Sequence, residues 1–352
     1  MLFLIFKNAA MKNTLFYTLF VSLTLFTHAH CQSVKTAKTS DKIKGITLVA
    51  PREPFRNAPM QELQTVKNQW IAVVPYAFTR MGEPSVRYDG NGRQHWGEIY
   101  EGIKVTIDSA HKAGLKVMLK PQVWVGGGWI GGLDFPTDAA WEKWETDYEK
   151  YIFPLAKIAD STGVELLCIG TEIKISATKR PQFWRNLIAK TRAVYHGQLV
   201  YAANWDEYDL VTFWNDLDYI GIDAYFSLMP KATPSVSELA EAWKPHLAAI
   251  QMVQKQQKKP VLFTEFGYMP IDSCTYKSWE IEKRRRGMPI NEAAQANAID
   301  ALFTVFWKES WWKGGFLWKW FPEVKAMEGR EMKDYTPQGK QAIGVLQKWY
   351  DK

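Results

Sequence analysis

The segment ELLCIGTE, residues 165–172, decides the fold, because it is one half of a unit that the chain repeats. It is an apolar run of strand length. Before it, the stretch WEKWETDYEKYIFPLAKIADSTG at 141–163 spaces its apolar residues as an amphipathic helix does and closes on a glycine. The short link TGVE at 162–165 joins the two. A helical pattern followed at once by an apolar run predicts one α/β unit.

The same alternation of apolar runs and helical patterns continues along the chain. The other strand-like runs are GITLVA 45–50, WIAVVPYAF 70–78, KVMLKPQVW 116–124, LVYAANW 199–205, YIGIDAY 219–225, VLFTEFGY 261–268 and GGFLWKWF 314–321. Eight strands that alternate with helices predict an α/β fold, the (β/α)8 TIM barrel, as a single domain. A doubly wound open sheet is the alternative. It would want a glycine-rich phosphate turn after the first strand, and VAPREPF at 49–55 is not one.

Loop lengths distinguish the two ends of the predicted barrel. Links from helix to strand are short, as in KKP at 258–260, whereas the loops that leave strands are long, as in 269–290. Two of the long loops also have unusual composition, GGGWIGG at 126–132 and DSCTYKSWE at 272–280. Strand-exit loops gather at the C-terminal face of a barrel, where barrel enzymes place their sites. We therefore expect the functional site at that face.

Two glutamates stand at equivalent places in predicted strands that lie nearly across the barrel from each other, Glu172 at the end of the fourth and Glu265 at the end of the seventh. Facing carboxylates can divide the work of hydrolysis. One is kept protonated and donates to a leaving oxygen, while the other is kept ionised and attacks or activates water. A separation of ~5–5.5 Å would predict retention through a covalent intermediate. A structural ion-pair network is the alternative for either glutamate alone. The pair, with tryptophans at nearby strand ends, predicts glycoside hydrolysis.

Other residues near strand ends are candidates for substrate binding, since polar groups can bond sugar hydroxyls and flat aromatic rings can cover the apolar faces of sugars. Asp223 could equally belong to an ion-pair scaffold. Lys120 is hard to explain as a core residue, and a Schiff-base lysine of an aldolase-like enzyme is a weaker alternative for it. The predicted substrate-binding residues are Lys120, Trp124, Asn204, Trp205, Asp223, Tyr225, Trp318 and Trp320.

Simple strand alternation also predicts which way the side chains of LFTEFGY, residues 262–268, point. Phe263 and Glu265 should face the barrel interior, and Leu262, Thr264 and Phe266 should face the helices. Glu265 would then stand where the packed interior opens into the cleft.

Composition excludes several other classes of function. The 352 residues carry a formal net charge of +7 without a basic stripe, and KRRR at 283–286 is interpreted as a solvated turn, so no nucleic-acid partner is predicted. Cys168 and Cys274 form no disulfide framework, and no HxxxH, CxxC or Asp-rich loop accompanies them. We predict no metal and no cofactor. The expected partner is a polysaccharide or oligosaccharide, and no protein partner is implied.

Residues 1–31 are predicted to be a signal peptide, with Met1–Ala10 as a candidate upstream extension. A basic start at Lys12 precedes an apolar stretch over 14–26 that is short for a membrane span. We predict export to the periplasm, cell surface or medium, a linker at 32–43 and a catalytic domain at 44–352. A lipid anchor at Cys31 is a second hypothesis, although His30 suits that processing poorly.

The motifs IGTEI at 169–173 and FTEFGY at 263–268 resemble those of the large clan of retaining (β/α)8 glycoside hydrolases with glutamates after strands 4 and 7. Within this clan the chain is most similar to glycoside hydrolase family 113, whose characterised members are β-mannanases. The resemblance runs from KGITLVAP to FLWKWFP. It implies Glu172 as acid/base, Glu265 as nucleophile and β-1,4-mannan as substrate. It also implies that Tyr225 bonds the nucleophile and that Trp318 or Trp320 floors the sugar site.

One position departs from the clan pattern. Most of the clan has an asparagine directly before the acid/base, where it contacts the sugar 2-hydroxyl, and this chain has Thr171. Asn204 is a candidate to take over that contact. Two alternatives therefore stay open, a retaining glycosidase for another β-linked glycan and a non-catalytic carbohydrate-binding protein on a degenerate barrel.

Overall fold

The computed structural model describes residues 42–90, 94–322 and 331–352, within a compact unit that spans Thr39–Lys352. The predicted signal peptide, Cys31 and nearly all of the predicted linker lie outside the described residues. Among the helices of the described ranges, none combines the length and the apolar character that crossing a membrane requires.

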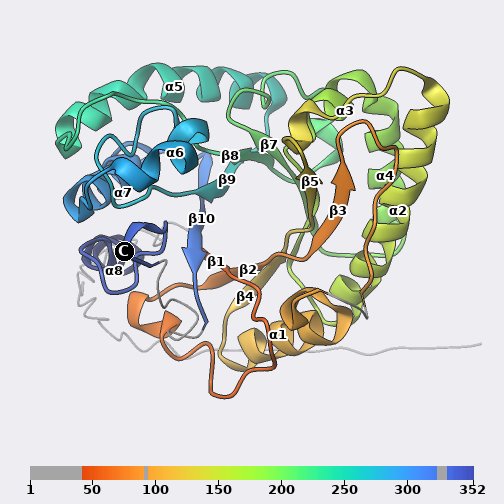
Figure 1. Cartoon of the computed structure of the whole chain (residues 1–352), viewed down its shortest axis with the longest axis horizontal. Helices are drawn as coiled ribbons and strands as arrows, with labels where there is room; N and C mark the ends of the chain where they lie inside the picture. The colour runs from red at the N-terminus through yellow and green to blue at the C-terminus, as the bar shows by residue number, and fades with distance from the viewer. Residues whose placement is uncertain (1–41, 91–93, 323–330) are drawn as a thin grey trace, which may run out of the picture. The chain divides into compact units, whose positions relative to one another are not determined.

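The described strands form a closed parallel barrel with a small ribbon beside it (Figure 1). This confirms the predicted (β/α)8 TIM barrel. Around the barrel the order is β1-β10-β9-β8-β7-β6-β4-β2, and β3 pairs with β5. The strands are β1 Ile43–Leu48, β2 Trp70–Val73, β3 Tyr76–Arg80, β4 Lys116–Leu119, β5 Gln122–Gly126, β6 Leu166–Thr171, β7 Gln198–Asn204, β8 Ile220–Asp223, β9 Val261–Phe266 and β10 Trp312–Trp320.

Helices surround the barrel, and several of them begin at a side-chain cap. Thr137 caps α2 by accepting from the Ala140 amide, Asn291 caps α7 by accepting from the Ala294 amide, and Ser235 forms a capping box with Glu238 at the start of α5. The helices are α1 Tyr100–Lys112, α2 Asp138–Ser161, α3 Lys174–Lys179, α4 Pro181–Arg192, α5 Val236–Gln257, α6 Ser278–Arg284, α7 Glu292–Phe306 and α8 Ala342–Tyr350.

Two predicted strands are each divided by a proline. The run 70–78 becomes β2 and β3 on either side of Pro75, and the run 116–124 becomes β4 and β5 on either side of Pro121. Proline has no N–H to donate to a strand ladder, so a strand ends or bends there. Beyond the prolines the chains pair again as the β3–β5 ribbon, with Tyr76 opposite Gln122. The ribbon extends the C-terminal end of the barrel, next to the region where a site is expected.

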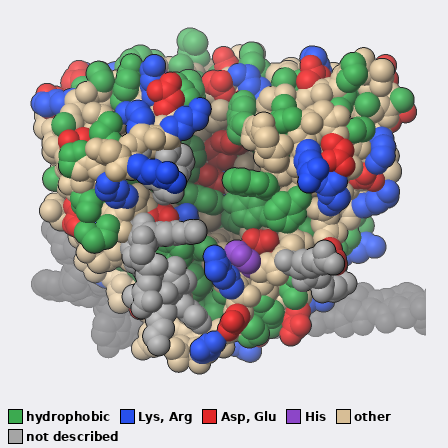
Figure 2. All heavy atoms as spheres, in the orientation of Figure 1, with side chains coloured by type: hydrophobic (Ala, Val, Ile, Leu, Met, Phe, Trp, Pro, Cys, Tyr) green, Lys and Arg blue, Asp and Glu red, His purple; other side chains and the backbone are tan. Residues whose placement is uncertain are grey.

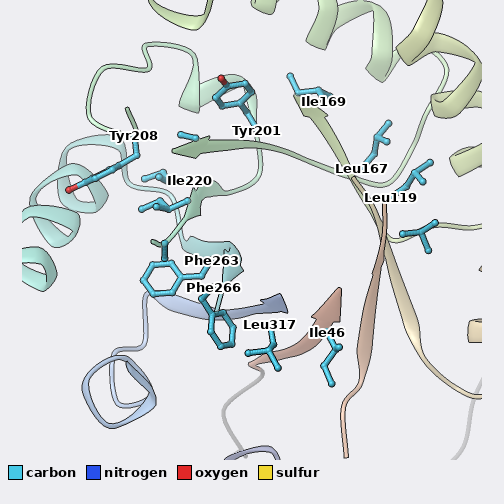
Figure 3. Close-up of a cluster of buried hydrophobic side chains, with 14 of the residues drawn as sticks. Ile46, Leu119, Leu167, Ile169, Tyr201, Tyr208, Ile220, Phe263, Phe266 and Leu317 are labelled. Atoms are coloured by element: carbon cyan, nitrogen blue, oxygen red, sulfur yellow. The ribbon is translucent and has the colours of Figure 1, made fainter. Parts of the chain in front are cut away.

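Two apolar layers hold these elements together. Inside the barrel, side chains from alternate strand positions pack on one another; they are Ile43, Trp70, Ala72, Met118, Leu166, Cys168, Val200, Ala202, Leu262 and Phe316. A larger layer fills the space between the strands and the helices (Figure 3). Burial of this continuous apolar surface is the main stabilising contribution to the barrel.

The predicted alternation in 262–268 is wrong at three positions. Leu262 packs inside the barrel. Thr264 also faces the barrel interior, where its hydroxyl donates to Asp223 over 2.7 Å. Phe263 instead belongs to the layer between strands and helices (Figure 3), and its ring lies 4.8 Å from that of Phe306. The register of β9 shifts against both neighbours beyond Phe263, so that Asp223 of β8 pairs with Glu265. An irregular step of this kind changes the side to which later residues point. Glu265 therefore faces the cleft although Phe263 points outward.

Candidate active site

A cavity of about 790 Å³ opens at the C-terminal ends of the barrel strands. Figure 2 shows a hollow on this face, with acidic side chains at its base and hydrophobic side chains on its wall. Its described lining residues are Trp129, Glu172, Asn204, Trp205, Asp206, Tyr225, Glu265, Ser278, Trp279, Trp318 and Tyr335. The two predicted glutamates thus share one cavity, from strands β6 and β9.

Glu265 is held by three donors, two from the junction of β4 and β5 and one from just after β8. Tyr225 donates its hydroxyl to Oε2 over 2.8 Å, Gln122 donates its amide to Oε1 over 2.6 Å, and Lys120 donates to the same oxygen. Its side chain is only 8% exposed. Three donors around the carboxylate hold it in one orientation, as an attacking nucleophile requires.

Lys120 lies beneath Glu265, with no exposed surface. Its ammonium also bonds Asp223 Oδ2 at 3.1 Å, and Asp223 accepts a further bond from Thr264 over 2.7 Å. Burial alone would lower the pKa of Lys120, but the charges of Asp223 and Glu265 outweigh it and hold that pKa above its usual value. A buried cation thus fixes one face of the Glu265 carboxylate.

Glu172 has a different environment, directly after the last residue of β6. Its Oε2 accepts from the Trp129 indole over 2.9 Å. Removal of water by the cleft walls, followed by the negative charge of Glu265, raises the pKa of Glu172 to about 7. A carboxyl group with this pKa can carry a proton at neutral pH, as a general acid must.

The backbone at Glu172 is unusual. Its φ of 55° lies in the left-handed region, which costs a residue with a Cβ roughly 1–2 kcal/mol. Its amide donates to the Ala202 carbonyl of β7 over 2.8 Å. Sparsely populated backbone conformations of this kind concentrate at functional sites.

The other predicted site residues divide into two groups. Asn204, Trp205, Tyr225 and Trp318 line the cavity. Lys120 and Asp223 are buried below it, so the expectation that they contact a sugar is replaced by a supporting role. Trp320 is 2% exposed in the core. Trp124 is 62% exposed on β5, outside the cavity lining.

Trp318 and Trp320 differ because β10 is irregular at its end. Thr47 of β1 pairs with Trp318, but the next residue, Leu48, pairs with Trp320. The extra residue in β10 breaks the simple alternation, so two positions that a regular strand would place on one face diverge. Trp318 turns to the cavity and Trp320 to the apolar layer outside the barrel.

Several lining residues were not predicted. Trp129 comes from the loop GGGWIGG, and Ser278 and Trp279 come from the loop at 269–290 and the start of α6. The rings of Trp279 and Trp205 are stacked, with centroids 4.9 Å apart. Loop composition indicated the region, but nothing in it specified which side chain would face the cavity. Asp206 and Tyr335 carried no signal. Gln122 does not line the cavity, but as a polar residue two positions after Lys120 near a predicted strand end it was recognisable from the sequence.

Thr171, the position that departs from the clan pattern, does not line the cavity. Its hydroxyl donates to the Pro121 carbonyl over 3.2 Å, and the residue is buried outside the cavity lining. Asn204 is at the cavity, where its side-chain amide donates to Asp206 over 2.8 Å.

Among the described residues, no group of three or more His, Cys, Asp or Glu side chains could hold a metal ion.

The sequence model of Glycoside Hydrolase Family 113 matches residues 52–340, most of the chain. The chain belongs to glycoside hydrolase family 113. It is therefore a glycoside hydrolase, and the site at the ends of β6 and β9 is the candidate active site of this family 113 enzyme.

Solved structures of the same family are similar over nearly their whole length. The β-mannanase AaManA from Alicyclobacillus acidocaldarius, in complex with ManMIm, has 25% identity and a TM-score of 0.75, covering 88% of this chain and 97% of its own. A GH113 β-1,4-mannanase structure has 27% identity and a TM-score of 0.73, with 88% and 99% covered. A β-glucuronidase from Ruminococcus gnavus, at 12% identity and a TM-score of 0.58, shares the fold, with 88% and 50% covered. No curated protein sequence gives a significant match.

Proposed function

We propose that this family 113 enzyme is a retaining β-1,4-mannanase. The observation that carries the mechanism is the contrast between two glutamates in one cavity. Glu265 is held by three donors including a buried lysine, and the pKa of Glu172 is raised to about 7. Different environments suit different roles, a nucleophile and an acid/base. The mannan substrate rests on the β-mannanases to which the chain is similar.

The reaction has two steps. Glu265 attacks the anomeric carbon while Glu172 gives its proton to the leaving glycosidic oxygen, which forms a covalent glycosyl-enzyme and releases the leaving sugar. Glu172, now ionised, takes a proton from water as the water displaces Glu265. Two inversions retain the β configuration. Trp318 is the candidate floor for the reacting sugar, and Asn204 the candidate partner of its 2-hydroxyl.

Incubation with β-1,4-mannan, and in parallel with β-glucans, tests the substrate. We expect new reducing ends from mannan, with products that NMR shows first in the β form. Reducing ends from another β-linked glycan alone would replace mannan as the substrate. Binding without any new reducing ends would favour the alternative of a non-catalytic carbohydrate-binding protein.

We also propose export of the protein through its N-terminal segment, which secretion of a tagged full-length chain would test.

Activity should fall as pH rises through about 7. Glu172 acts in the first step only while protonated, and its raised pKa places the loss of that proton near pH 7. The measurement is the pH profile of kcat/KM on a manno-oligosaccharide. An aryl β-mannoside with an activated leaving group needs no proton donor, so its profile should lack this alkaline fall. The same alkaline fall with both substrates would contradict the role of Glu172.

Trp124 is proposed to bind the substrate beyond the cavity. It pairs with Phe78 across the β3–β5 ribbon, two residues along from Gln122, which bonds Glu265. Side chains at i and i+2 share a face, about 7 Å apart. Trp124→Ala should raise KM for mannohexaose about three- to ten-fold, with little change in kcat or for short substrates. Met252→Ala, at an exposed apolar position on α5, is the control. Equal effects on long and short substrates would exclude this role.

A further inference from the structure

Glu207 is a carboxylate that the proposed reaction does not use, and it is completely buried. It lies in the turn after β7, where its Oε2 accepts from the backbone N–H of Asn204 over 3.0 Å. Its Oε1 accepts from the Tyr201 hydroxyl over 2.5 Å. Burial raises the pKa of Glu207 to about 7. Burying a carboxylate costs free energy, and the two hydrogen bonds offset part of that cost. Because Glu207 has no role in the proposed reaction, the question is what these bonds hold in place.

Tyr201 connects Glu207 to the acid/base. Tyr201 is on β7, also fully buried, and its ring packs between the strands and helices, 5.1 Å from the ring of Trp184 and 5.5 Å from that of Phe213. While its hydroxyl donates to Glu207, the same oxygen accepts from the amide of Ile173 over 2.9 Å. Ile173 is the residue directly after Glu172.

Strand β7 therefore holds the chain on both sides of the Glu172 Cα. The Glu172 amide donates to Ala202, and the Ile173 amide donates to Tyr201, the neighbouring residue of the same strand. These two amides belong to the peptide planes whose rotations are φ and ψ of Glu172. A left-handed φ of 55° is unfavourable for a glutamate. Such a conformation persists only if surrounding contacts fix the peptide planes on both sides of the residue.

We propose that Tyr201 and Glu207 are positioning residues that hold Glu172 in its left-handed conformation, so that its carboxyl group faces the cavity. Glu207 fixes the Tyr201 hydroxyl by accepting its proton, and the hydroxyl oxygen then accepts from Ile173. The role of Glu172 as acid/base, on which this inference rests, is that of the proposed function.

Tyr201→Phe is the sharpest test, because it removes the hydroxyl and keeps the packed ring. A misplaced general acid slows departure of poor leaving groups and spares good ones. We expect kcat/KM to fall about ten-fold or more for a manno-oligosaccharide, and less than about two-fold for an activated aryl β-mannoside. Tyr195→Phe is the matched control. Its buried hydroxyl donates to the Val164 carbonyl, which lies before the start of β6, at the opposite end of that strand from Glu172.

A spectroscopic measurement separates this inference from the proposed function. The Trp129 indole N–H donates to Glu172, so its ¹⁵N–¹H resonance, assigned by its loss in Trp129→Phe, reports the place of that carboxyl group. It should shift in Tyr201→Phe and stay in Tyr195→Phe. If the wild type hydrolyses no β-glycoside, the proposed function fails and the resonance alone decides this inference.

Two results would overturn the inference. One is an unmoved Trp129 resonance in Tyr201→Phe. The other is an equal loss of kcat/KM for good and poor leaving groups. If Tyr201→Phe does not fold, Glu207→Gln replaces it, since glutamine keeps the side-chain size and one acceptor oxygen for two donors. The same selective loss and the same shift are expected from it, and an unmoved resonance would again overturn the inference.

Discussion

Glu265→Ala should abolish hydrolysis, with kcat on mannan falling on the order of 10⁴-fold or more. The substitution removes the group that attacks the anomeric carbon, so no covalent intermediate forms. A better leaving group does not restore the missing bond, and an activated aryl β-mannoside should be turned over no better. The measurements are initial rates on both substrates, and mass spectrometry of the wild type trapped with a fluorinated sugar, which should label Glu265.

Stability must be measured alongside, because Glu265 is part of a buried ion-pair network. Its removal leaves Lys120 paired with Asp223 alone, and Gln122 and Tyr225 lose an acceptor. Thermal unfolding shows whether the variant is folded when it is assayed. Glu265→Gln keeps the shape of the side chain, and it should be as inactive. A folded variant that kept near-wild-type turnover would exclude Glu265 as nucleophile.

Glu172→Ala should have an effect that depends on the leaving group. On manno-oligosaccharides, loss of the proton donor should lower kcat/KM roughly 10²- to 10⁴-fold. With an activated aryl β-mannoside the first step needs no acid, so a rapid burst of the aryl group should precede a slow phase. The slow phase arises because water is no longer activated to release the sugar from Glu265. Azide needs no general base, so it should accelerate turnover and give the β-glycosyl azide.

Glu165→Gln is the matched control for this second prediction. Glu165 comes directly before β6 and Glu172 directly after it, so the two glutamates lie at opposite ends of one strand. Glu165 bonds the Val117 amide over 2.8 Å and lies near His111, outside the cavity lining. In Glu165→Gln, the dependence of kcat/KM on the leaving group should be the same as in the wild type. Uniform loss in Glu172→Ala, or no acceleration by azide, would contradict the acid/base role.

Much of the barrel was predictable because its signals are local. Each buried strand is a short apolar run, and the helical stretches between them have their own periodicity, so eight units could be counted without knowing how they pack. The prolines at 75 and 121 were visible in the same runs. What was not visible is that the chain pairs again beyond them, which depends on contacts between two segments far apart in the sequence.

Orientation of side chains was predictable only where a strand is regular. Alternation gave the wrong side for Leu262, Phe263 and Thr264, and it could not separate Trp318 from Trp320, because β9 and β10 each change register near the site. Such shifts arise from how neighbouring strands fit together. Lys120 is a related case. It could be recognised as an unusual residue for a strand interior, but its two carboxylate partners come from strands more than a hundred residues away.

The sequence by itself determined the alternation of strands and helices, the end of the barrel that carries the site, and the two glutamates at strand ends. These follow from local patterning and from the fixed direction of parallel strands. Only the tertiary structure decided the different environments of the two glutamates. These are the buried Lys120 beneath Glu265 and the hydrogen bonds from β7 to the backbone on both sides of Glu172. Burial, charge and hydrogen bonding depend on which distant residues meet, so they exist only once the barrel has closed.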